Sequence, residues 1–205
     1  LLINQPAFVF GTGDTFARFM IARARGGLSL FRFLVEWKGW WGAFGAVRQL
    51  QAMVARLFTG FATQAFYSAA PIQCGPYAVR VRLQPAREAV ERETRGEPDF
   101  GGDLERHLAS GELVYALQLQ FFVDEATTPI EDASVDWPED VAPYTTVARL
   151  TIAPDALDQA RDPDFVEQVE REAYDPWKAL AVHRPLGNVM RVRKATYYPS
   201  YTARS

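Results

Sequence analysis

The hydrophobic periodicity of this chain changes part-way along its length, and this change constrains the fold more than any other feature. From about residue 16 to residue 66, apolar residues recur at spacings of three and four. This spacing is typical of amphipathic helices, and two or three helices fit. From residue 79 the spacing becomes two, as in half-buried antiparallel strands. We therefore predict an α+β fold with an antiparallel sheet.

The same patterns predict the individual elements. Strands are expected at residues 2–10, 79–83, 117–123 and 145–152. Further helices are expected at residues 104–109, 163–174 and 188–198. Asp162 and Pro163 form a favourable helix start, and Pro199 is expected to stop the last helix. The charged, glycine-containing segment 87–102 predicts a mobile surface loop.

Composition limits the classes of function. The chain has 205 residues, 48% of them hydrophobic, so it can bury a core, and we expect a single domain over residues 1–205. A net charge of -3 gives no basic excess for nucleic acid. Cys74 is the only cysteine, which excludes an intramolecular disulfide and a Cys-based metal cluster and fits a reducing, cytoplasmic location. Two histidines are too few for a multi-histidine metal site.

The stretch Trp37–Trp41, with Phe44 nearby, is rich in aromatic residues. Such a stretch could form a patch on a membrane surface or face a lipid. We favour packing against the core or a neighbouring subunit, and do not expect the membrane surface as a partner. Charged residues interrupt every run that could reach the roughly 18 residues of a spanning helix.

One pair near the C-terminus could carry chemistry. Arg193 and Tyr197 are four residues apart in a predicted helix, so the guanidinium can reach the phenol oxygen. A free tyrosine has a pKa of about 10, whereas a nearby cation and a ferric iron both favour the phenolate. The same spacing also occurs in ordinary surface Arg–Tyr pairs. The signatures of serine hydrolases, P-loops, zinc proteases and dinucleotide binders are absent from the sequence.

Three sequence blocks, in order, resemble haem catalases, above all the short catalase-like proteins. They are residues 129–138 (PIEDASVDWP), 165–176 (FVEQVEREAYDP) and 183–191 (HRPLGNVMR). At the other end, residues 4–8 (NQPAF) are similar to the Asn-x-Pro-x-Phe strand of that family. The resemblance implies a catalase-type antiparallel β-barrel, incomplete in this chain, with added helices and a C-terminal haem-ligand helix.

The resemblance also implies a haem b cofactor and roles for individual residues. Tyr197 would be the proximal iron ligand, and Arg193 its charge partner. Asn4 would donate a hydrogen bond to a bound peroxide, although it could instead simply end a strand. Phe16 would pack near the haem plane. Arg204 would pair with a haem propionate, although it could be no more than a terminal charge.

The match departs from the family at one point. Tyr197 is followed by Tyr198 before Pro199, where the family often has proline directly after the ligand. Tyr198 is therefore a rival ligand, with Lys194 four residues before it. We prefer Tyr197 because arginine stays charged and offers a planar fork that lysine lacks.

In this family the distal histidine precedes the Asn-x-Pro strand, and neither His107 nor His183 matches its motif. We therefore expect the sequence to lack N-terminal barrel strands. These strands would come from an upstream segment or another subunit, which we favour over the alternative that the protein has dispensed with them. The resemblance implies a peroxidase- or catalase-like oxidoreductase acting on peroxide or organic hydroperoxides, as a homo-oligomer or with such a partner. Rearrangement of a fatty-acid hydroperoxide and a non-catalytic haem-binding or assembly role remain open.

Overall fold

The computed structural model describes residues 2–54, 58, 60–68, 70–86, 99–172 and 174–202. The strands are β1 (Leu2–Ile3), β2 (Phe66–Ser68), β3 (Ile72–Cys74), β4 (Tyr77–Pro85), β5 (Leu113–Phe121) and β6 (Tyr144–Ile152). The helices are α1 (Gly13–Ala24), α2 (Gly27–Val54), α3 (Phe100–Ala109), α4 (Ala156–Arg161), α5 (Pro163–Arg171), the 3₁₀ helix η1 (Ala181–His183) and α6 (Gly187–Thr202). The mixed helical and antiparallel architecture is confirmed. Most of the loop predicted at residues 87–102 lies outside the described residues.

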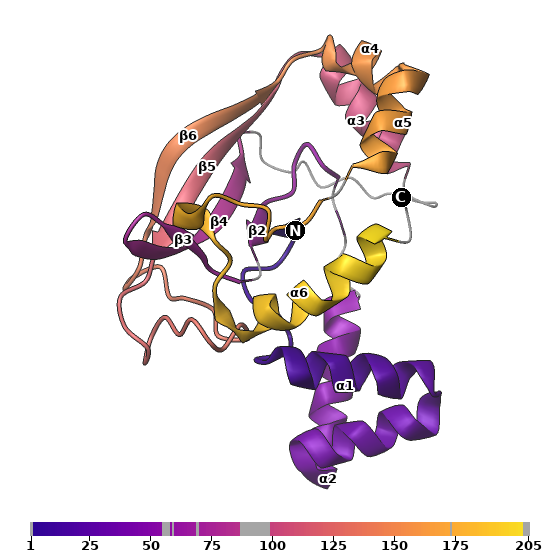
Figure 1. Ribbon diagram of the computed structural model, residues 1–205, viewed down its shortest axis with the longest axis vertical. Coiled ribbons are helices and arrows are strands. Elements are labelled where there is room, and N and C mark those ends of the chain that lie inside the picture. The colour runs from indigo at the N-terminus through magenta and orange to yellow at the C-terminus, as the bar shows by residue number, and fades with distance from the viewer. Residues whose placement is uncertain are drawn as a thin grey trace.

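The sheet is antiparallel throughout and curved (Figure 1). Its strand order is β1-β2-β4-β5-β6, and β3 pairs with β4 off this path. Among the described residues, β1 and β6 occupy the two ends of the order and are not paired with each other. The sheet is therefore open and does not close into a barrel.

One face of the sheet departs from the usual polar-outside pattern. Arg80 of β4 and its cross-strand partner Gln120 of β5 are each only 1% exposed. The segment between β5 and β6 covers them. In this segment the Trp137 ring centroid lies 4.5 Å from Arg80 Cζ. The Gln120 amide donates to the backbone oxygens of Trp137 and Ala142, both at 2.8 Å. The predicted alternation of apolar and polar residues is confirmed, but a loop rather than solvent covers the polar side chains.

The N-terminal strand is shorter than its apolar pattern predicts. After Ile3 the chain leaves the sheet, since Pro6 has no N–H to donate to a strand ladder. The segment then pairs with the loop after β5: Phe8 N donates to Ala133 O at 2.9 Å, and Ala133 N to Gly11 O at 3.1 Å. The predicted strand over residues 2–10 is thus wrong beyond residue 3.

Helices α1 and α2 form a hairpin that extends away from the sheet (Figure 1). Phe10, Phe33 and Leu34 are buried at its base and centre, and Trp37 packs against Phe10 with ring centroids 5.3 Å apart. Helix α2 bends at Gly39, whose φ of 73° is readily adopted only by glycine. No helix in the described part of the chain is long and apolar enough to cross a bilayer.

Helix α6 runs past the sheet and packs on the start of α1. Gly13 lies so close to α6 that a Cβ there would be 2.7 Å from Val192 Cγ2. The helix continues through Pro199 to Thr202, so the predicted stop at Pro199 is wrong. A proline removes one backbone hydrogen bond, and near a helix end this loss leaves the remaining turns in place.

Candidate functional site

The start of α6 is held by contacts that only its particular residues allow. Gly187 has a φ of 80°, and a Cβ there would lie 2.6 Å from the Ile130 backbone oxygen. The next residue, Asn188, accepts a hydrogen bond from Gly13 N at 2.9 Å and donates one to the backbone oxygen of Glu131. The helix is thereby fixed both to α1 and to the segment that covers the sheet.

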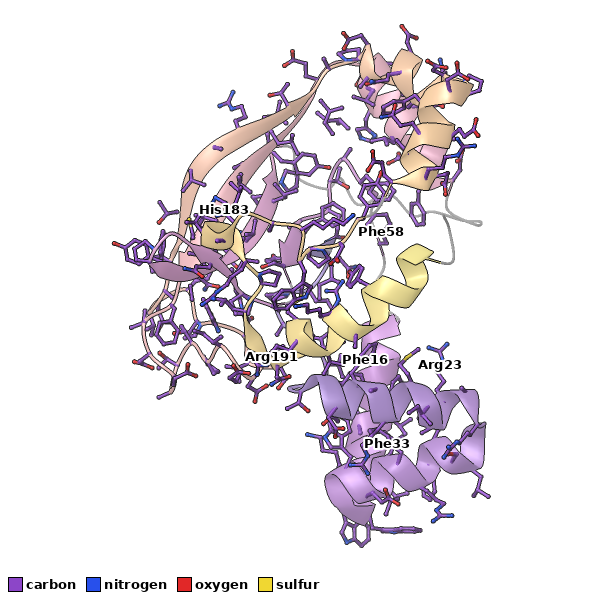
Figure 2. The ribbon with its side chains drawn as sticks, in the orientation of Figure 1. Phe16, Arg23, Phe33, Phe58, His183 and Arg191 are labelled. Carbon is purple, nitrogen blue, oxygen red and sulfur yellow. The ribbon has the colours of Figure 1, made fainter. Side chains whose placement is uncertain are left out.

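An ion pair extends this attachment by one turn. Arg191 Nη1 and Nη2 contact the two carboxylate oxygens of Glu131 at 3.0 and 2.6 Å. The hydrogen bonds from Arg191 lower the pKa of the Glu131 carboxyl and raise the pKa of the guanidinium. Figure 2 shows Arg191 and Phe16 where α6 meets α1. Glu131 therefore serves to position the helix.

The pair predicted from the sequence forms on the next turns of α6. The Arg193 guanidinium donates a hydrogen bond to the phenol oxygen of Tyr197, and its Cζ lies 5.2 Å from the ring centroid. Arg193 Nη1 also lies 3.6 Å from the sulfur of Met190, which is buried. Both Arg193 and Tyr197 are half-buried. A charged donor of this kind supports an oxygen that carries negative charge.

The rival tyrosine has a different neighbourhood. Lys194, four residues before Tyr198, places its Nζ 4.8 Å from the Trp177 ring. Trp177 in turn donates its indole N–H to the backbone oxygen of Met190 at 3.1 Å. The side chain of Tyr198 lies outside the described residues.

The other predicted site residues are spread over the N-terminal elements and the C-terminus. Phe16 of α1 packs edge-on against Phe8, with ring centroids 5.2 Å apart, within the aromatic core at the base of the hairpin. Asn4 is half-buried directly after β1. No hydrogen bond joins either residue to Tyr197 in the described part of the chain. Arg204 lies outside the described residues.

The two histidines lie on other elements. His107 is in α3, where its Nδ1 lies 2.8 Å from the backbone oxygen of Asp103. His183 is exposed in η1, beside β3, with its Nδ1 3.4 Å from the backbone oxygen of Gln73 (Figure 2). Within the described residues, no group of three or more His, Cys, Asp or Glu side chains is placed to hold a metal ion.

Sequence reasoning missed the buried Arg80. Its Nη1 donates to the Val135 backbone oxygen at 2.8 Å, whereas its Nε and Nη2 are buried without a hydrogen-bond partner in the described structure. Burial lowers the pKa of this guanidinium to about 10. The one sequence signal at Arg80 is the alternation of apolar and polar residues along the strand, and this alternation predicts that Arg80 is exposed.

Comparison with known proteins decides the fold. No family model matches the chain, and no curated protein does. Among the solved structures that match are three in which 99% of the chain is covered: a fungal catalase (TM-score 0.75, 16% identity), a bacterial catalase (0.70, 17%) and catalase A from Saccharomyces cerevisiae (0.74, 15%). The chain has the catalase fold. It spans 44%, 43% and 45% of the lengths of those three proteins.

The resemblance to catalases is thus confirmed at the level of the fold, and the likeness extends over nearly the whole of the present chain. Identities of 15–17% carry no residue roles with them.

Proposed function

We propose that this chain binds haem b through the Tyr197 phenolate and takes part in the peroxidase- or catalase-like oxidoreduction of hydroperoxides. The observation that carries the proposal is the hydrogen bond from the Arg193 guanidinium to the Tyr197 oxygen on α6. The catalase fold supports it, because proteins of that name are its structural neighbours.

The donor set suits a haem. Tyr197 offers one oxygen with one cationic hydrogen-bond donor beside it. A haem iron takes four ligands from its macrocycle and needs only an axial ligand from the protein, for which tyrosine serves in catalase. A bare metal ion would require several protein ligands. One supported phenol oxygen is therefore sufficient for a haem.

Each residue then has a defined task. When bound, haem supplies redox-active iron for cleavage of the O–O bond. Arg193 holds negative charge on the Tyr197 oxygen. The amide of Asn4 donates a hydrogen bond that orients the peroxide, and Phe16 packs beside the macrocycle. Arg204 pairs with a propionate, which suits the fork of a guanidinium.

Two alternatives rest on particular observations. Trp40, Trp41 and Phe44 are 57%, 85% and 57% exposed, which favours an apolar substrate and hence rearrangement of a fatty-acid hydroperoxide. His107 on α3 and His183 on η1 each place Nδ1 beside a backbone oxygen, of Asp103 and Gln73, which favours a haem-binding or assembly role without turnover.

The test begins with titration of ferric haem into the purified chain and into Tyr197→Phe. Tyr174→Phe is the matched control, since Tyr174 is 60% exposed and its hydroxyl donates to Val169 O at 3.2 Å. We expect wild type and the control to take up haem and Tyr197→Phe to lose the phenolate-type spectrum. Wild-type protein that refuses haem contradicts the proposal.

Product analysis then separates the functions. Haem-loaded protein supplied with hydrogen peroxide or with a fatty-acid hydroperoxide should oxidise a donor or release dioxygen. An isomer of the fatty-acid hydroperoxide as the product would favour rearrangement, and unchanged substrate would favour the non-catalytic role. If Tyr198→Phe loses the spectrum and Tyr197→Phe keeps it, the ligand is the later tyrosine.

A further inference from the structure

Charge is distributed unevenly between the α1–α2 hairpin and the rest of the chain. Residues 13–54 contain six basic and two acidic residues, a net charge of +4. The whole chain has a net charge of -3, so the remaining residues together carry -7. An anionic surface should therefore attract the basic hairpin and repel the acidic remainder of the chain.

The hairpin also exposes large apolar side chains. Trp40 and Trp41 directly follow the bend at Gly39 and are 57% and 85% exposed, and Phe44 one turn later is 57% exposed. Leu28, at the start of α2, is 78% exposed. The packing that we favoured from the sequence holds for Trp37. Trp40 packs edge-on against Phe31, with ring centroids 5.7 Å apart, and Phe31 is itself 38% exposed. Tryptophan is enriched where one side of a surface is apolar and the other wet.

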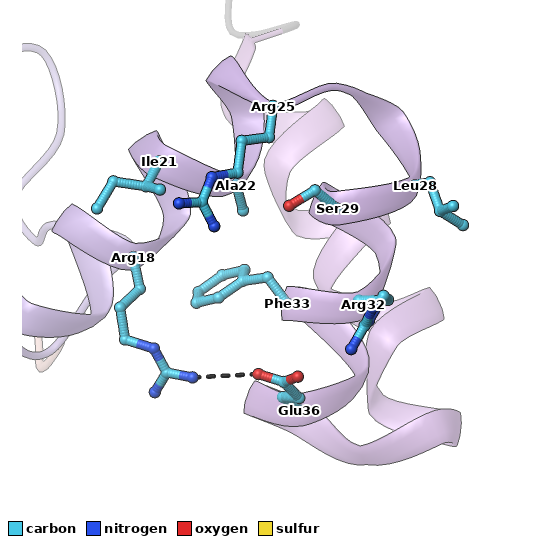
Figure 3. A pocket seen from close by; sticks show the side chains of 9 residues that line it. All are labelled: Arg18, Ile21, Ala22, Arg25, Leu28, Ser29, Arg32, Phe33 and Glu36. Atoms are coloured by element: carbon cyan, nitrogen blue, oxygen red, sulfur yellow. Dashed lines mark hydrogen bonds and ion pairs between the residues drawn. The ribbon is translucent and has the colours of Figure 1, made fainter.

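A cationic groove lies between the two helices (Figure 3). It has a volume of about 620 Å³, and Arg18, Arg25 and Arg32 line it together with Ser29. Arg18 is paired with Glu36 at 3.2 Å. The side chains of Arg25 and Arg32 make no ion pair or hydrogen bond to any described residue. Two guanidinium groups are thus available to an anion beside apolar surface.

We propose that the α1–α2 hairpin docks on the surface of an anionic phospholipid bilayer. Trp40, Trp41 and Phe44 enter the interfacial region of the bilayer, while Arg25 and Arg32 bind lipid phosphates. Guanidinium groups bind phosphate oxygens in a bidentate manner, and basic side chains near an anionic leaflet each add to the attraction.

Other occupants of this surface fit less well. A second copy of the chain in a two-fold contact would oppose one +4 hairpin to another, and like charges across an interface repel. A nucleic acid matches the charge but gives no partner for aliphatic Leu28 or for Ile21, which is 52% exposed. A phospholipid bilayer matches both the positive charge, with its anionic headgroups, and the exposed apolar side chains, with its hydrocarbon.

Vesicle co-sedimentation of the full chain tests this proposal. We expect binding to vesicles of phosphatidylcholine with phosphatidylserine, little binding to pure phosphatidylcholine, and a decline as salt screens the charges. Trp40→Ala with Trp41→Ala should reduce partitioning at least about tenfold. Arg25→Gln and Arg32→Gln should each reduce it about fivefold.

Two body variants are the matched controls. Arg161→Gln removes an exposed charge on α4 that is paired with Glu105 at 2.8 Å, and Tyr174→Ala removes an exposed ring. Both should bind vesicles as wild type does.

Equal binding to neutral and anionic vesicles would overturn the proposal, as would hairpin variants that bind normally. Loss of dimerisation in the tryptophan variant, without vesicle binding in wild type, would assign the surface to a second copy. If an oligonucleotide displaces the wild-type protein from vesicles and binds the tryptophan variant more weakly, the surface is assigned to nucleic acid instead.

Discussion

Arg193 and Tyr197 lie one turn apart on α6, and the guanidinium of the first donates a hydrogen bond to the phenol oxygen of the second. The first turns of the same helix are held by Gly187, Asn188 and Arg191. The candidate ligand and its charge partner therefore belong to a helix whose start is anchored to two other parts of the chain.

Arg193→Gln should weaken haem affinity about tenfold or more, because a hydrogen bond from a charged group contributes roughly 1.5–3 kcal/mol. Arg193→Lys should fall between wild type and Arg193→Gln, since lysine keeps the charge without the fork. Haem titration followed by absorption measures both. Arg171→Gln, at an exposed position of α5, is the control, and equal affinities in all four proteins would remove Arg193 from the site.

Gly187→Ala should lower the free energy of unfolding by about 1–3 kcal/mol, since it places a side chain at positive φ and against the Ile130 oxygen. Gly45→Ala is its counterpart within α2, where a Cβ meets no atom within 4 Å. That substitution should raise the free energy of unfolding by roughly 0.5–1 kcal/mol. Urea unfolding of the two variants checks the contrast, and equal effects would contradict the anchoring at Gly187.

The Glu131–Arg191 pair should make stability depend on pH. Because the pKa of Glu131 is lowered in the folded chain, the contribution of the pair is fully present above the pKa of a free carboxyl, about 4.3. It is lost as pH falls through the lower, folded-state pKa. Glu131→Gln should therefore cost about 0.5–1 kcal/mol at pH 7 and progressively less as the pH is lowered through the folded-state pKa of Glu131.

Denaturant unfolding at several pH values measures this dependence. Glu167→Gln removes the i,i+4 partner of Arg171 within α5 and leaves the contact between α6 and the sheet cover untouched. It should cost less at pH 7 than Glu131→Gln. A loss that is the same at pH 3 and pH 7 in Glu131→Gln would show that the carboxylate charge is not what matters.

The pattern of the sequence was sufficient for the long elements. Strands β4, β5 and β6 follow from period-two alternation, and α6 follows from its helical spacing, because each buries one regular face. Strands β2 and β3 have only three residues each and leave too short a pattern to read. Helix α4 was missed for the same reason, since it has six residues.

The periodicity of a strand cannot predict that a loop will bury the strand's polar side chains. Arg80 and Gln120 read as the solvent side of their strands, and only the segment carrying Trp137 and Ala142 removes that solvent. The Arg193–Tyr197 contact could be predicted, because four residues along a helix bring side chains to one face. The position of Asn4 relative to that pair depends on the packing of distant segments, which spacing does not encode.

The buried arginine gives a further prediction. Arg80→Met should lower the free energy of unfolding less than Arg80→Ala, because methionine keeps contact with the Trp137 ring and leaves no buried charge. Alanine leaves a cavity as well, and should cost roughly 2 kcal/mol more. Thermal and urea unfolding compare the two variants. Equal losses would mean that the volume of Arg80 contributes little beside its hydrogen bond to Val135.

The proposed function requires that the Tyr197 oxygen binds the haem iron. The most direct measurement is the resonance Raman spectrum of the haem-loaded ferric protein, in which phenolate ring modes should be enhanced and should shift when tyrosine is ring-deuterated. We expect these modes in wild type, Tyr174→Phe and Tyr198→Phe, and their loss in Tyr197→Phe. Phenolate modes that persist in Tyr197→Phe would contradict it.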